Sequence, residues 1–466
     1  MKRPSPGDAS PDDLAELQRE TFRYFVHEAN PGNGLVPDNT RYGAPCSIAA
    51  VGFGLASYPV AVRRGWLTRL EAAERTALTL RFFDRSPQGP QPDATGYRGF
   101  YYHFLEMRTG RRSHRCELST MDSAILLAGA LTAGAFFDGD SEPEREIRET
   151  SERLYGRADW TWAARGKGPI SHGWFPESGF LPSTWTGYNE ALILYVLALG
   201  SPTHPVAPAS YDVWTKTYRW KEVYGERFLY SGPLFTHQLS HIWIDFRGIQ
   251  DAFMRGKKMD YFENSCRATR VQQRYAAKNP HGFDGYGEYC WGVTASDGPG
   301  NVVQRIRGVT RRFYDYRARG VPFGPDDGTI SPWAAVTSLP FAPEIVRPTV
   351  AFFNRRYPEM RSDYGFMCSF NPTFRVAGGK GWVARGYYGL DQGPVVLMIE
   401  NERSEMIWEL MRGCSPLVRG LRRAGFRGGW LDGSIRSDSQ EGSRSRRPPR
   451  NVRGGPRVRT GVRPIS

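Results

Sequence analysis

The chain contains long segments in which apolar residues recur at helical spacing, separated by loops rich in glycine, proline and tryptophan. This pattern predicts helices near residues 12–28, 46–63, 68–84, 119–137, 143–156, 189–199, 234–253, 258–278, 343–356 and 391–411. Strand signals are few, and "GFMCSFNPTFRVAGG" at 365–379 is the best candidate for a hairpin. We therefore expect an all-α fold with long loops and a minor β-hairpin.

The predicted helices are of two kinds. Segments such as "AILLAGALTAGAFF" and "EALILYVLALG" are apolar nearly all round, whereas "TRLEAAERTALTLRFF" and "EPEREIRETSERLYG" carry charges on one face. A helix that is apolar on every side must be surrounded by protein. The alternation of the two kinds predicts an inner ring of helices wrapped by an outer ring, which is an α/α barrel.

The two ends of the chain differ in composition from the body. Residues 1–11 are expected to be a disordered lead-in, and residues 12–430 to form one catalytic domain. The end, 431–466, is rich in arginine, glycine and proline and has almost no apolar content, so we expect it to be disordered.

The net charge of +14 is concentrated near the end of the chain. Residues 412–466 hold 14 arginines against 3 acidic residues, which leaves about +3 for everything before them. Because positive and negative charges nearly cancel in the body of the chain, a nucleic-acid partner is not required. As a separate expectation, we predict that the protein is a monomer.

Cysteine spacing and hydropathy restrict the class of protein further. The 6 cysteines include no C-x-x-C pair, which favours isolated reduced thiols. No apolar run approaches the roughly 18 residues of a membrane span, and the N-terminal stretch has no apolar signal-peptide core. We expect a cytoplasmic protein from the sequence as it stands, or a periplasmic one if the N-terminus is incomplete.

Three acidic residues stand where predicted apolar helices begin. Asp122 follows the N-cap candidate Ser119, Glu190 opens an apolar helix, and Asp391 precedes a Gly-Pro and another apolar helix. Each acid taken alone fits helix capping or the helix dipole. In an α/α barrel, however, the inner helices run parallel and their N-termini gather at one mouth, so the three carboxyl groups would face one pocket.

Converging carboxyl groups with aromatic neighbours suit glycoside hydrolysis, in which one acid donates a proton and another activates water. Glu190 lies beside Trp185 and Tyr188, whose apolar flank would raise its pKa and favour the acid role. Asp391 lies in a glycine-rich stretch that we expect to be more open, which suits the base.

At these residues the chain resembles the bacterial glucoamylase-like domain family, which includes endo-β-1,2-glucanases and the transglycosylase domain of cyclic β-1,2-glucan synthases. The resemblance covers about residues 20–411. Its blocks, in order, are "TFRYFVHEANPGNGLVPD", "ELSTMDSAILLAGAL", "GYNEALILYVLALGSPTHP", "PLFTHQLSHIWIDFRGIQD", "WGVTASDGP", "DGTISPWAAVTSLPFAPE" and "GLDQGPVVLMIEN".

The resemblance implies an (α/α)6 barrel that hydrolyses β-1,2-linked glucan by acid/base chemistry without a metal or other cofactor. It points to Glu190 as the acid, and it leaves open which of Glu117, Asp122 and Asp391 activates or orients water. We expect an endo-acting, inverting enzyme. The alternatives are a retaining β-1,2-glucan transglycosylase and a non-catalytic glycan-binding protein.

The stretch "HQLSH" resembles the zinc-protease motif H-E-x-x-H, with Gln238 in place of the catalytic glutamate. A zinc site on His237 and His241 is therefore a further alternative. Since Gln238 has neither charge nor useful basicity, we instead expect the two histidines to bind glucose hydroxyls or to orient a carboxylate at the barrel mouth.

The remaining substrate-binding candidates are aromatic or polar residues near these motifs. Each also has a structural explanation: Asp297 before Gly-Pro is a turn former, and Arg247 can pair with Asp245. The candidates are Trp185, Tyr188, Asn189, Arg247, Trp291 and Asp297.

Overall fold

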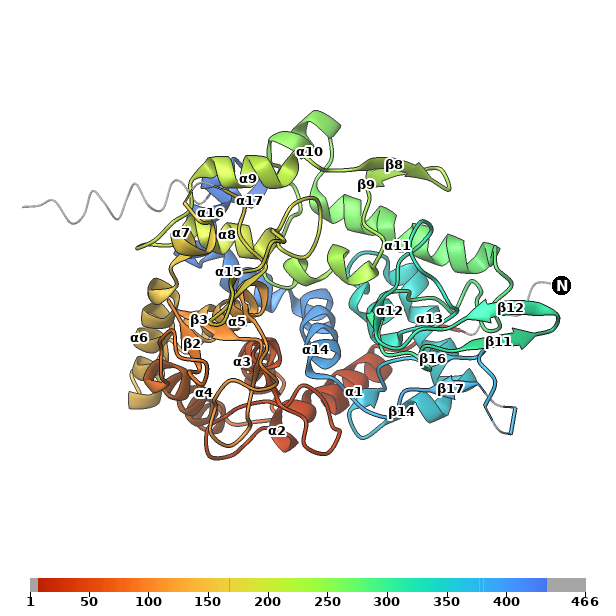
Figure 1. Ribbon diagram of the computed structural model, residues 1–466, viewed down its shortest axis with the longest axis horizontal. Helices are drawn as coiled ribbons and strands as arrows, with labels where there is room; N and C mark the ends of the chain where they lie inside the picture. Colours follow the sequence, from red (N-terminus) through yellow and green to blue (C-terminus); the bar gives the residue numbers. More distant parts are fainter. Residues whose placement is uncertain (1–6, 167, 377, 380, 434–466) are drawn as a thin grey trace, which may run out of the picture.

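The computed structural model describes residues 7–166, 168–376, 378–379 and 381–433, and these form a mostly helical fold (Figure 1). The α-helices are α1 Pro11–Phe22, α2 Tyr24–His27, α3 Ile48–Arg63, α4 Arg69–Arg85, α5 Thr120–Phe136, α6 Glu142–Arg157, α7 Trp160–Ala163, α8 Leu192–Gly200, α9 Pro208–Thr215, α10 Ala252–Lys257, α11 Tyr261–Lys278, α12 Pro332–Thr337, α13 Pro343–Arg356, α14 Gly389–Ser404, α15 Met406–Arg412, α16 Ser415–Arg423 and α17 Gly429–Gly433. The 3-10 helices are η1 Leu234–His237, η2 Leu239–Ile242 and η3 Pro358–Met360.

Short strands decorate the loops, and all of their pairings are antiparallel. One sheet has the order β2 Gly96–Tyr97, β3 Phe100–Tyr102, β5 Leu118–Ser119, β6 Gly173–Phe175 and β7 Gly179–Phe180. The two-stranded pairs are β1 Cys46–Ser47 with β4 Phe104–Leu105, β8 Trp220–Val223 with β9 Glu226–Leu229, β10 Ala295–Ser296 with β13 Arg317–Ala318, β11 Val303–Ile306 with β12 Val309–Arg312, β14 Arg361–Ser362 with β15 Gly365–Phe366, and β16 Phe370–Asn371 with β17 Trp382–Val383.

The single hairpin predicted over 365–379 is wrong. Its first half contains β15, which pairs with the preceding strand β14. Its second half contains β16, which pairs with the following strand β17. The chain turns at Asn371, whose side-chain oxygen accepts from the backbone N–H groups of Thr373 and Phe374, both at 3.0 Å. Such a turn ends the strand before it can fold back on its neighbour.

The two kinds of helix occupy the environments that their patterns predict. Helices α3 and α5 are buried along almost their whole length and pack together, while α4 and α6 lie outside them and expose their charged faces. The close approach of α3 and α5 depends on glycine. A Cβ on Gly129 would lie 2.0 Å from the backbone oxygen of Gly52.

The helix predicted over 234–253 is wrong. The segment forms η1 and η2, and α10 begins only at Ala252. Gln238 interrupts the helix, and its amide Nε2 donates to the backbone oxygen of Ala334 and to the hydroxyl of Ser338, both at 2.7 Å. Ser240 in turn bonds the backbone oxygen of Glu190 at 2.9 Å. The segment therefore lies between α8 and α12, held by tertiary contacts.

Other differences concern where elements begin and end. The helix predicted over 391–411 is divided at Glu405, whose φ of 57° separates α14 from α15. Part of the expected lead-in is ordered, since Ala9 is buried and Ser10 caps α1. Helix α17 extends to Gly433, three residues into the predicted tail, and the rest of that tail lies outside the described residues.

Two expectations from composition can be compared with the structure. All six cysteines are buried, and Cys46, Cys116, Cys266, Cys368 and Cys414 are free thiols, as predicted. Within the described ranges, none of the helices combines the length and the apolar character needed to cross a bilayer.

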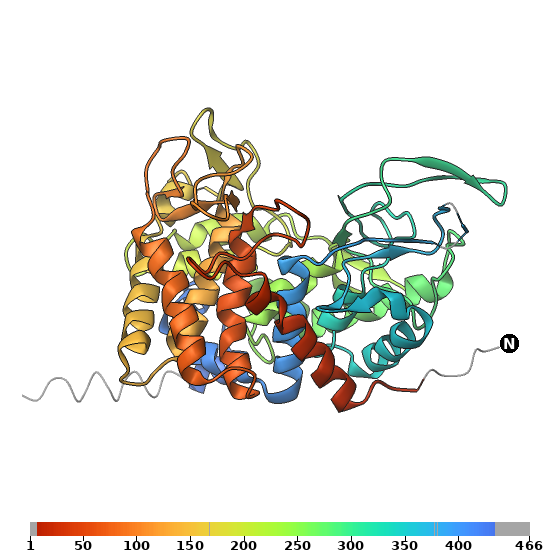
Figure 2. The same cartoon turned by 90° about the horizontal axis from the view of Figure 1, so that it is seen from below.

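The arrangement of helices and loops places the candidate site. In Figure 2 the longer helices stand side by side, and the loops and short strands drawn in orange and yellow gather beyond one of their ends. Helix α5 begins directly after strand β5 of the five-stranded sheet, which ties the start of this helix to that loop layer.

Candidate active site

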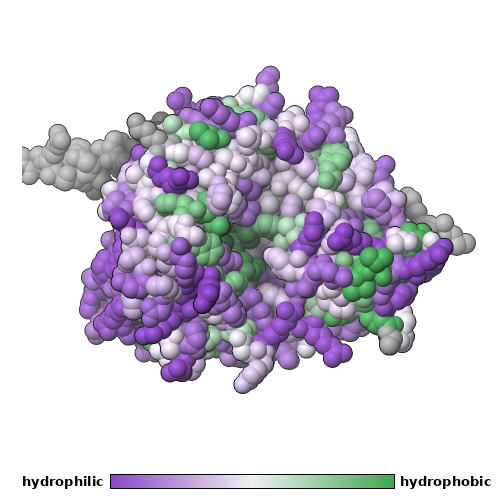
Figure 3. All heavy atoms as spheres, viewed as in Figure 1, coloured by the Kyte–Doolittle hydropathy of each residue, from purple (hydrophilic) through white to green (hydrophobic). Residues whose placement is uncertain are grey.

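A cavity of about 610 Å³ lies where the first turns of α5 and α14 and the segment before α8 meet the loops. Figure 3 shows a hollow near the middle of this face, with apolar residues inside it and hydrophilic residues around its rim. Acidic side chains dominate the polar part of the cavity lining: Asp38, Glu117, Asp122, Glu190, Asp297 and Asp391.

Local structure explains how the sequence-predicted acids reach this cavity. Ser119 caps α5 and accepts from the backbone N–H of Asp122 at 3.2 Å, so Asp122 stands in the first turn. Glu190 lies two residues before α8, and Asp391 is the third residue of α14. All four predicted acids, including Glu117 just before β5, therefore line one cavity.

Glu190 has the environment of a proton donor. Burial raises the pKa of its carboxyl group to about 7, and the negative charge of Asp122 acts in the same direction. The residue is half-buried, so that the carboxyl group is desolvated and still reaches the cavity. At neutral pH a substantial fraction of Glu190 is protonated.

A histidine that the sequence analysis did not select lies between two of the acids. His103 Nδ1 donates to Glu117 Oε1 at 2.8 Å, and its Nε2 lies 3.6 Å from Asp122 Oδ1. Burial opposes the charged form of the ring, but Asp122, Glu117 and Asp38 outweigh it and raise the pKa of His103 to about 9. The imidazolium in turn holds the pKa of Glu117 below its usual value against the effect of burial.

The environment of Asp391 differs from the one that the sequence predicts. We expected an open environment, but the residue is only 6% exposed, and its Oδ2 has no hydrogen-bond partner among the described residues. Burial raises the pKa of Asp391 well above its usual range, and the charges of Asp297 and Asp38 add to this effect. The environment therefore disfavours the charged form of Asp391, because the first turn of α14 is buried.

Hydrogen-bonded polar side chains around Asp297 and Asp38 form another part of the cavity wall. Asp297 accepts from the guanidinium of Arg41 and, at 2.5 Å, from the hydroxyl of Tyr388. Burial of Asp38 raises the pKa of its carboxyl group, although its bond from Asn39 at 2.8 Å opposes this. The cavity thus presents both hydrogen-bond donors and acceptors, as recognition of sugar hydroxyl groups requires.

Aromatic rings supply much of the remaining lining. Trp185 stacks on His172 with ring centroids 3.9 Å apart, and its Nε1 donates to Thr120 Oγ1 at 3.0 Å. Tyr316 and Trp333 also line the cavity. Of the substrate-binding candidates from the sequence, Trp185 and Asp297 are in the lining.

The other substrate-binding candidates do not line this cavity. Tyr188 is buried and stacks on Tyr261 at 5.8 Å, and Asn189 caps the turn by accepting from the N–H of Ala191. Trp291 is fully buried, with Nε1 bonded to Thr349 Oγ1 at 2.8 Å. These side chains fill the core or cap a turn, so their predicted contact with a sugar does not fit their positions.

Arg247 and the two histidines of "HQLSH" are also engaged away from the cavity. Arg247 pairs with Asp245 at 2.8 Å and with Glu405 at 2.8 Å. His237 and His241 are buried and bond separate partners: Ser231 O for the first and Ser265 Oγ for the second. Burial lowers the pKa of His237 to about 4 and that of His241 to about 3, so both rings are neutral parts of the core.

Sequence reasoning missed residues that reach the cavity from loops. Asp38 and Arg41 come from the segment before α3, His103 from the loop between β3 and β4, and Tyr316 and Tyr388 from loops after residue 312. Asp38, Arg41, His103 and Tyr316 do not stand at the start of an apolar helix, which was the signal used for the acids, whereas Tyr388 is the N-cap of α14. The one usable signal is the block "NPGNGLVPD", a glycine- and proline-rich loop that ends at Asp38.

The chain belongs to the Glycoamylase family, whose model, described as "Putative glucoamylase", matches residues 182–415. A solved structure from Bacteroides uniformis with the same description is 32% identical, with a TM-score of 0.81, and the match covers 91% of this chain and 100% of that one.

Two relatives carry names that state an activity. The structure of an endo-β-1,2-glucanase from Chitinophaga pinensis with sophorotriose and glucose is 25% identical, with a TM-score of 0.78 over 90% of this chain and 99% of that chain. An exo β-1,2-glucooligosaccharide sophorohydrolase from Parabacteroides distasonis is 28% identical over 448 residues, which is 88% of this chain. The match spans 57% of that curated relative's length.

Proposed function

We propose that this protein is a glycoside hydrolase that cleaves β-1,2-linked glucan, with Glu190 as the general acid. The observation that carries the proposal is the state of Glu190: a half-buried carboxyl group, with its pKa raised to about 7, at the wall of a cavity lined by five further acids. The names of the sophorohydrolase and the endo-β-1,2-glucanase described above specify β-1,2-linked substrates, which supports the choice of substrate.

The proposed reaction is an inverting displacement. Protonated Glu190 donates its proton to the glycosidic oxygen as that bond breaks, and an ionised carboxylate removes a proton from the water that attacks the anomeric carbon. His103 bonds Glu117 and lowers the pKa of that carboxyl group, whereas burial raises the pKa of Asp391. We therefore place the base at Glu117, or at Asp122 on the other side of the same histidine, ahead of Asp391.

Endo action and the (α/α)6 architecture belong to the same proposal. The match with the endo-β-1,2-glucanase extends over 99% of that chain, which supports cleavage within a polymer.

Helices α12, α14, α3, α5 and α8 contact one another in that order, and the segment of η1 and η2 bonds both α8 and α12. We propose that this segment takes the sixth inner position of the barrel.

The test is incubation of the purified protein with linear β-1,2-glucan and a panel of other glucans, followed by product sizing. We expect short β-1,2-linked oligosaccharides and no products from the other linkages. Glu190→Gln should abolish cleavage while preserving glucan binding, and Glu152→Gln, at an exposed position on α6, should have no effect. Cleavage by Glu190→Gln at the wild-type rate would reject the assignment of the acid.

Two further measurements separate the alternatives and locate the base. The anomer formed first, followed by NMR, should be α; an initial β product or net transfer between sugars would indicate a retaining transglycosylase. Binding without any cleavage by the wild-type protein would indicate a glycan-binding protein. Among Asp122→Ala, Glu117→Ala and Asp391→Ala, azide should restore activity only to the variant that lacks the base.

A further inference from the structure

Two loop segments that do not carry the proposed catalytic acids also line the cavity. One contains Asp297, next to β10, and the other contains Tyr316, just before β13. Tyr316 belongs to the cavity lining although the residue is 67% exposed, so its ring stands at the opening and not in the core. The described residues therefore present an aromatic ring and a carboxylate close together on this wall.

The regular structure that joins the two segments is very short. Strands β10 and β13 pair only Ala295 with Ala318 and Ser296 with Arg317. Asp297 and Tyr316 both lie just beyond this two-residue ladder. Other contacts must hold them in place.

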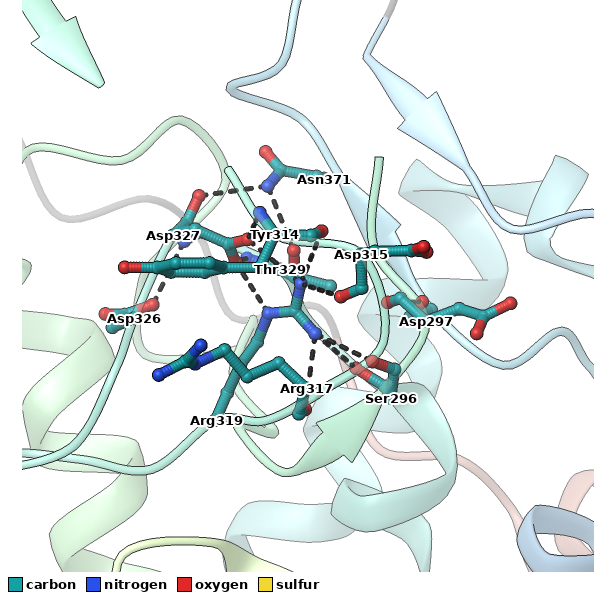
Figure 4. Close-up of polar contacts among 12 residues, drawn as sticks. Ser296, Asp297, Tyr314, Asp315, Arg317, Arg319, Asp326, Asp327, Thr329 and Asn371 are labelled. Carbon is teal, nitrogen blue, oxygen red and sulfur yellow. Dashed lines mark hydrogen bonds and ion pairs between the residues drawn. The ribbon is translucent and has the colours of Figure 1, made fainter. Parts of the chain in front are cut away.

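The buried guanidinium of Arg319 supplies such contacts to the backbone of both segments (Figure 4). Asp297 itself is also held by the bonds from Arg41 and Tyr388 to its side chain and by a bond from the hydroxyl of Ser369 to its backbone oxygen at 2.8 Å. Its Nη1 donates to the backbone oxygen of Ser296 at 2.7 Å, and its Nη2 donates to the backbone oxygens of Tyr314 at 3.0 Å and Asp315 at 3.2 Å. Ser296 directly precedes Asp297, and Tyr314 and Asp315 are the two residues before Tyr316. Arg319 thus bonds the backbone immediately next to both cavity-lining side chains.

The partner of Arg319 completes the same cluster. Asp327 accepts from Arg319 Nε at 2.8 Å and Nη2 at 2.9 Å, and neither side chain is exposed. Asp327 also accepts from the N–H groups of Tyr314 at 3.0 Å and Thr329 at 3.1 Å. The second segment is therefore bonded through both its N–H and C=O groups.

Gly298 shows how tightly the backbone surrounds this guanidinium. A Cβ on Gly298 would lie 2.1 Å from Arg319 Nη2 and 2.2 Å from the backbone oxygen of Tyr314. Only glycine fits at this position without displacing the cluster. A buried ion pair contributes little net stability compared with apolar packing, and defining one specific geometry is the role that best explains its presence here.

We propose that Arg319, together with Asp327, is a positioning residue that holds Asp297 and Tyr316 as a preformed subsite for one glucosyl unit. This inference rests on the proposed function for its ligand. The ring of Tyr316 would cover the apolar face of the sugar, and Asp297 would accept from its hydroxyl groups. Arg319 touches neither the sugar nor the reacting atoms, and acts only through the two loops.

The decisive variant is Arg319→Lys. A lysine ammonium keeps the positive charge beside Asp327, but it has three donors in place of the planar fork that reaches the backbone carbonyls of both segments. We expect KM for β-1,2-glucan to rise about tenfold or more, because small displacements of binding groups are costly. The change in kcat should be small, and the loss of activity above pH 7 that Glu190 controls should keep its midpoint.

The control is Arg64→Lys. Arg64 forms a comparable two-bond pair with buried Glu400, at 2.8 Å for both bonds, and it lies outside the cavity lining. We expect this variant to lower the melting temperature without changing KM. Equal KM values for Arg319→Lys and the wild type, or equal KM increases in both Lys variants, would overturn the proposal.

A double-mutant cycle with Tyr316→Ala separates positioning from general destabilisation. If Arg319 acts through Tyr316, then Arg319→Lys should raise KM much less in the Tyr316→Ala background than in the wild type. If the KM increase of the double variant equals the product of the increases in the two single variants, the proposal is contradicted. If Arg319→Lys does not fold, Gly298→Ala, which displaces the same cluster from the other side, takes its place in the cycle.

Hydrogen exchange in the sugar-free protein gives a readout that does not depend on activity. Arg319→Lys should increase amide exchange in residues 294–298 and 313–318 and leave the first turns of α5 and α14 unchanged. Unchanged exchange in both loops rejects the positioning role, even if the wild type proves inactive on β-1,2-glucan. Inactivity of the wild type with the expected exchange pattern rejects only the glucan ligand and the proposed function.

Discussion

The charge state of His103 gives a stability prediction that can be worked out from the structure. The ring lies between Glu117 and Asp122, stacks on Phe104 with centroids 4.0 Å apart, and has its pKa raised from 6.5 to about 9. A shift of this size corresponds to about 3 kcal/mol of preference for the charged ring in the folded state. Its side chain is 26% exposed, so solvent screening makes this an upper value.

The sign of the pH dependence follows from the direction of the shift. A group whose pKa is higher in the folded than in the unfolded protein contributes stability that is complete below its unfolded pKa. For His103 the contribution is therefore present below about pH 6.5 and is lost as the pH rises through about 9. In His103→Asn the two carboxylates also lose their cationic partner.

To test this, the free energy of unfolding of His103→Asn and of the wild type is measured by denaturant titration at pH 6.5 and at pH 10. The variant should be less stable than the wild type by up to about 3 kcal/mol at pH 6.5, and the difference should largely disappear at pH 10. His114→Asn, at an exposed histidine, should show no difference at either pH. An equal destabilisation by His103→Asn at both pH values would show that it arises from lost packing and not from the charge of the ring.

Three further outcomes follow from the site and the helix packing. Since Glu190 must be protonated to act and its pKa is about 7, kcat should fall about tenfold per pH unit above neutrality; a flat profile up to pH 9 would contradict the acid role. Trp185→Ala should raise KM for the glucan about tenfold while Trp185→Phe retains most of the affinity, and equal binding by both variants would remove the ring from the site. Gly129→Ala should lower stability by about 1–3 kcal/mol because its Cβ would meet the backbone of Gly52, whereas Gly256→Ala on α10 meets nothing and should be neutral; matching melting temperatures would show that α3 and α5 can separate.

The helical segments were largely predictable because their signals are local. The capping pair Thr68 and Glu71 begins α4, and Ser119 begins α5, within a residue of the predicted starts. Apolar periodicity and capping involve residues three or four apart, so they can be recognised in the sequence alone. The segment 234–253 failed because Gln238 forms its bonds with Ala334 and Ser338, about 100 residues away.

The candidate site divides in the same way. The sequence determined that Asp122, Glu190 and Asp391 stand where apolar helices begin, because that property depends only on their neighbours in the chain. Only the tertiary structure decided that His103 lies between Glu117 and Asp122, and that Asp391 is buried. Charge state depends on desolvation and on charges within a few ångströms, and packing alone brings those groups together across the chain.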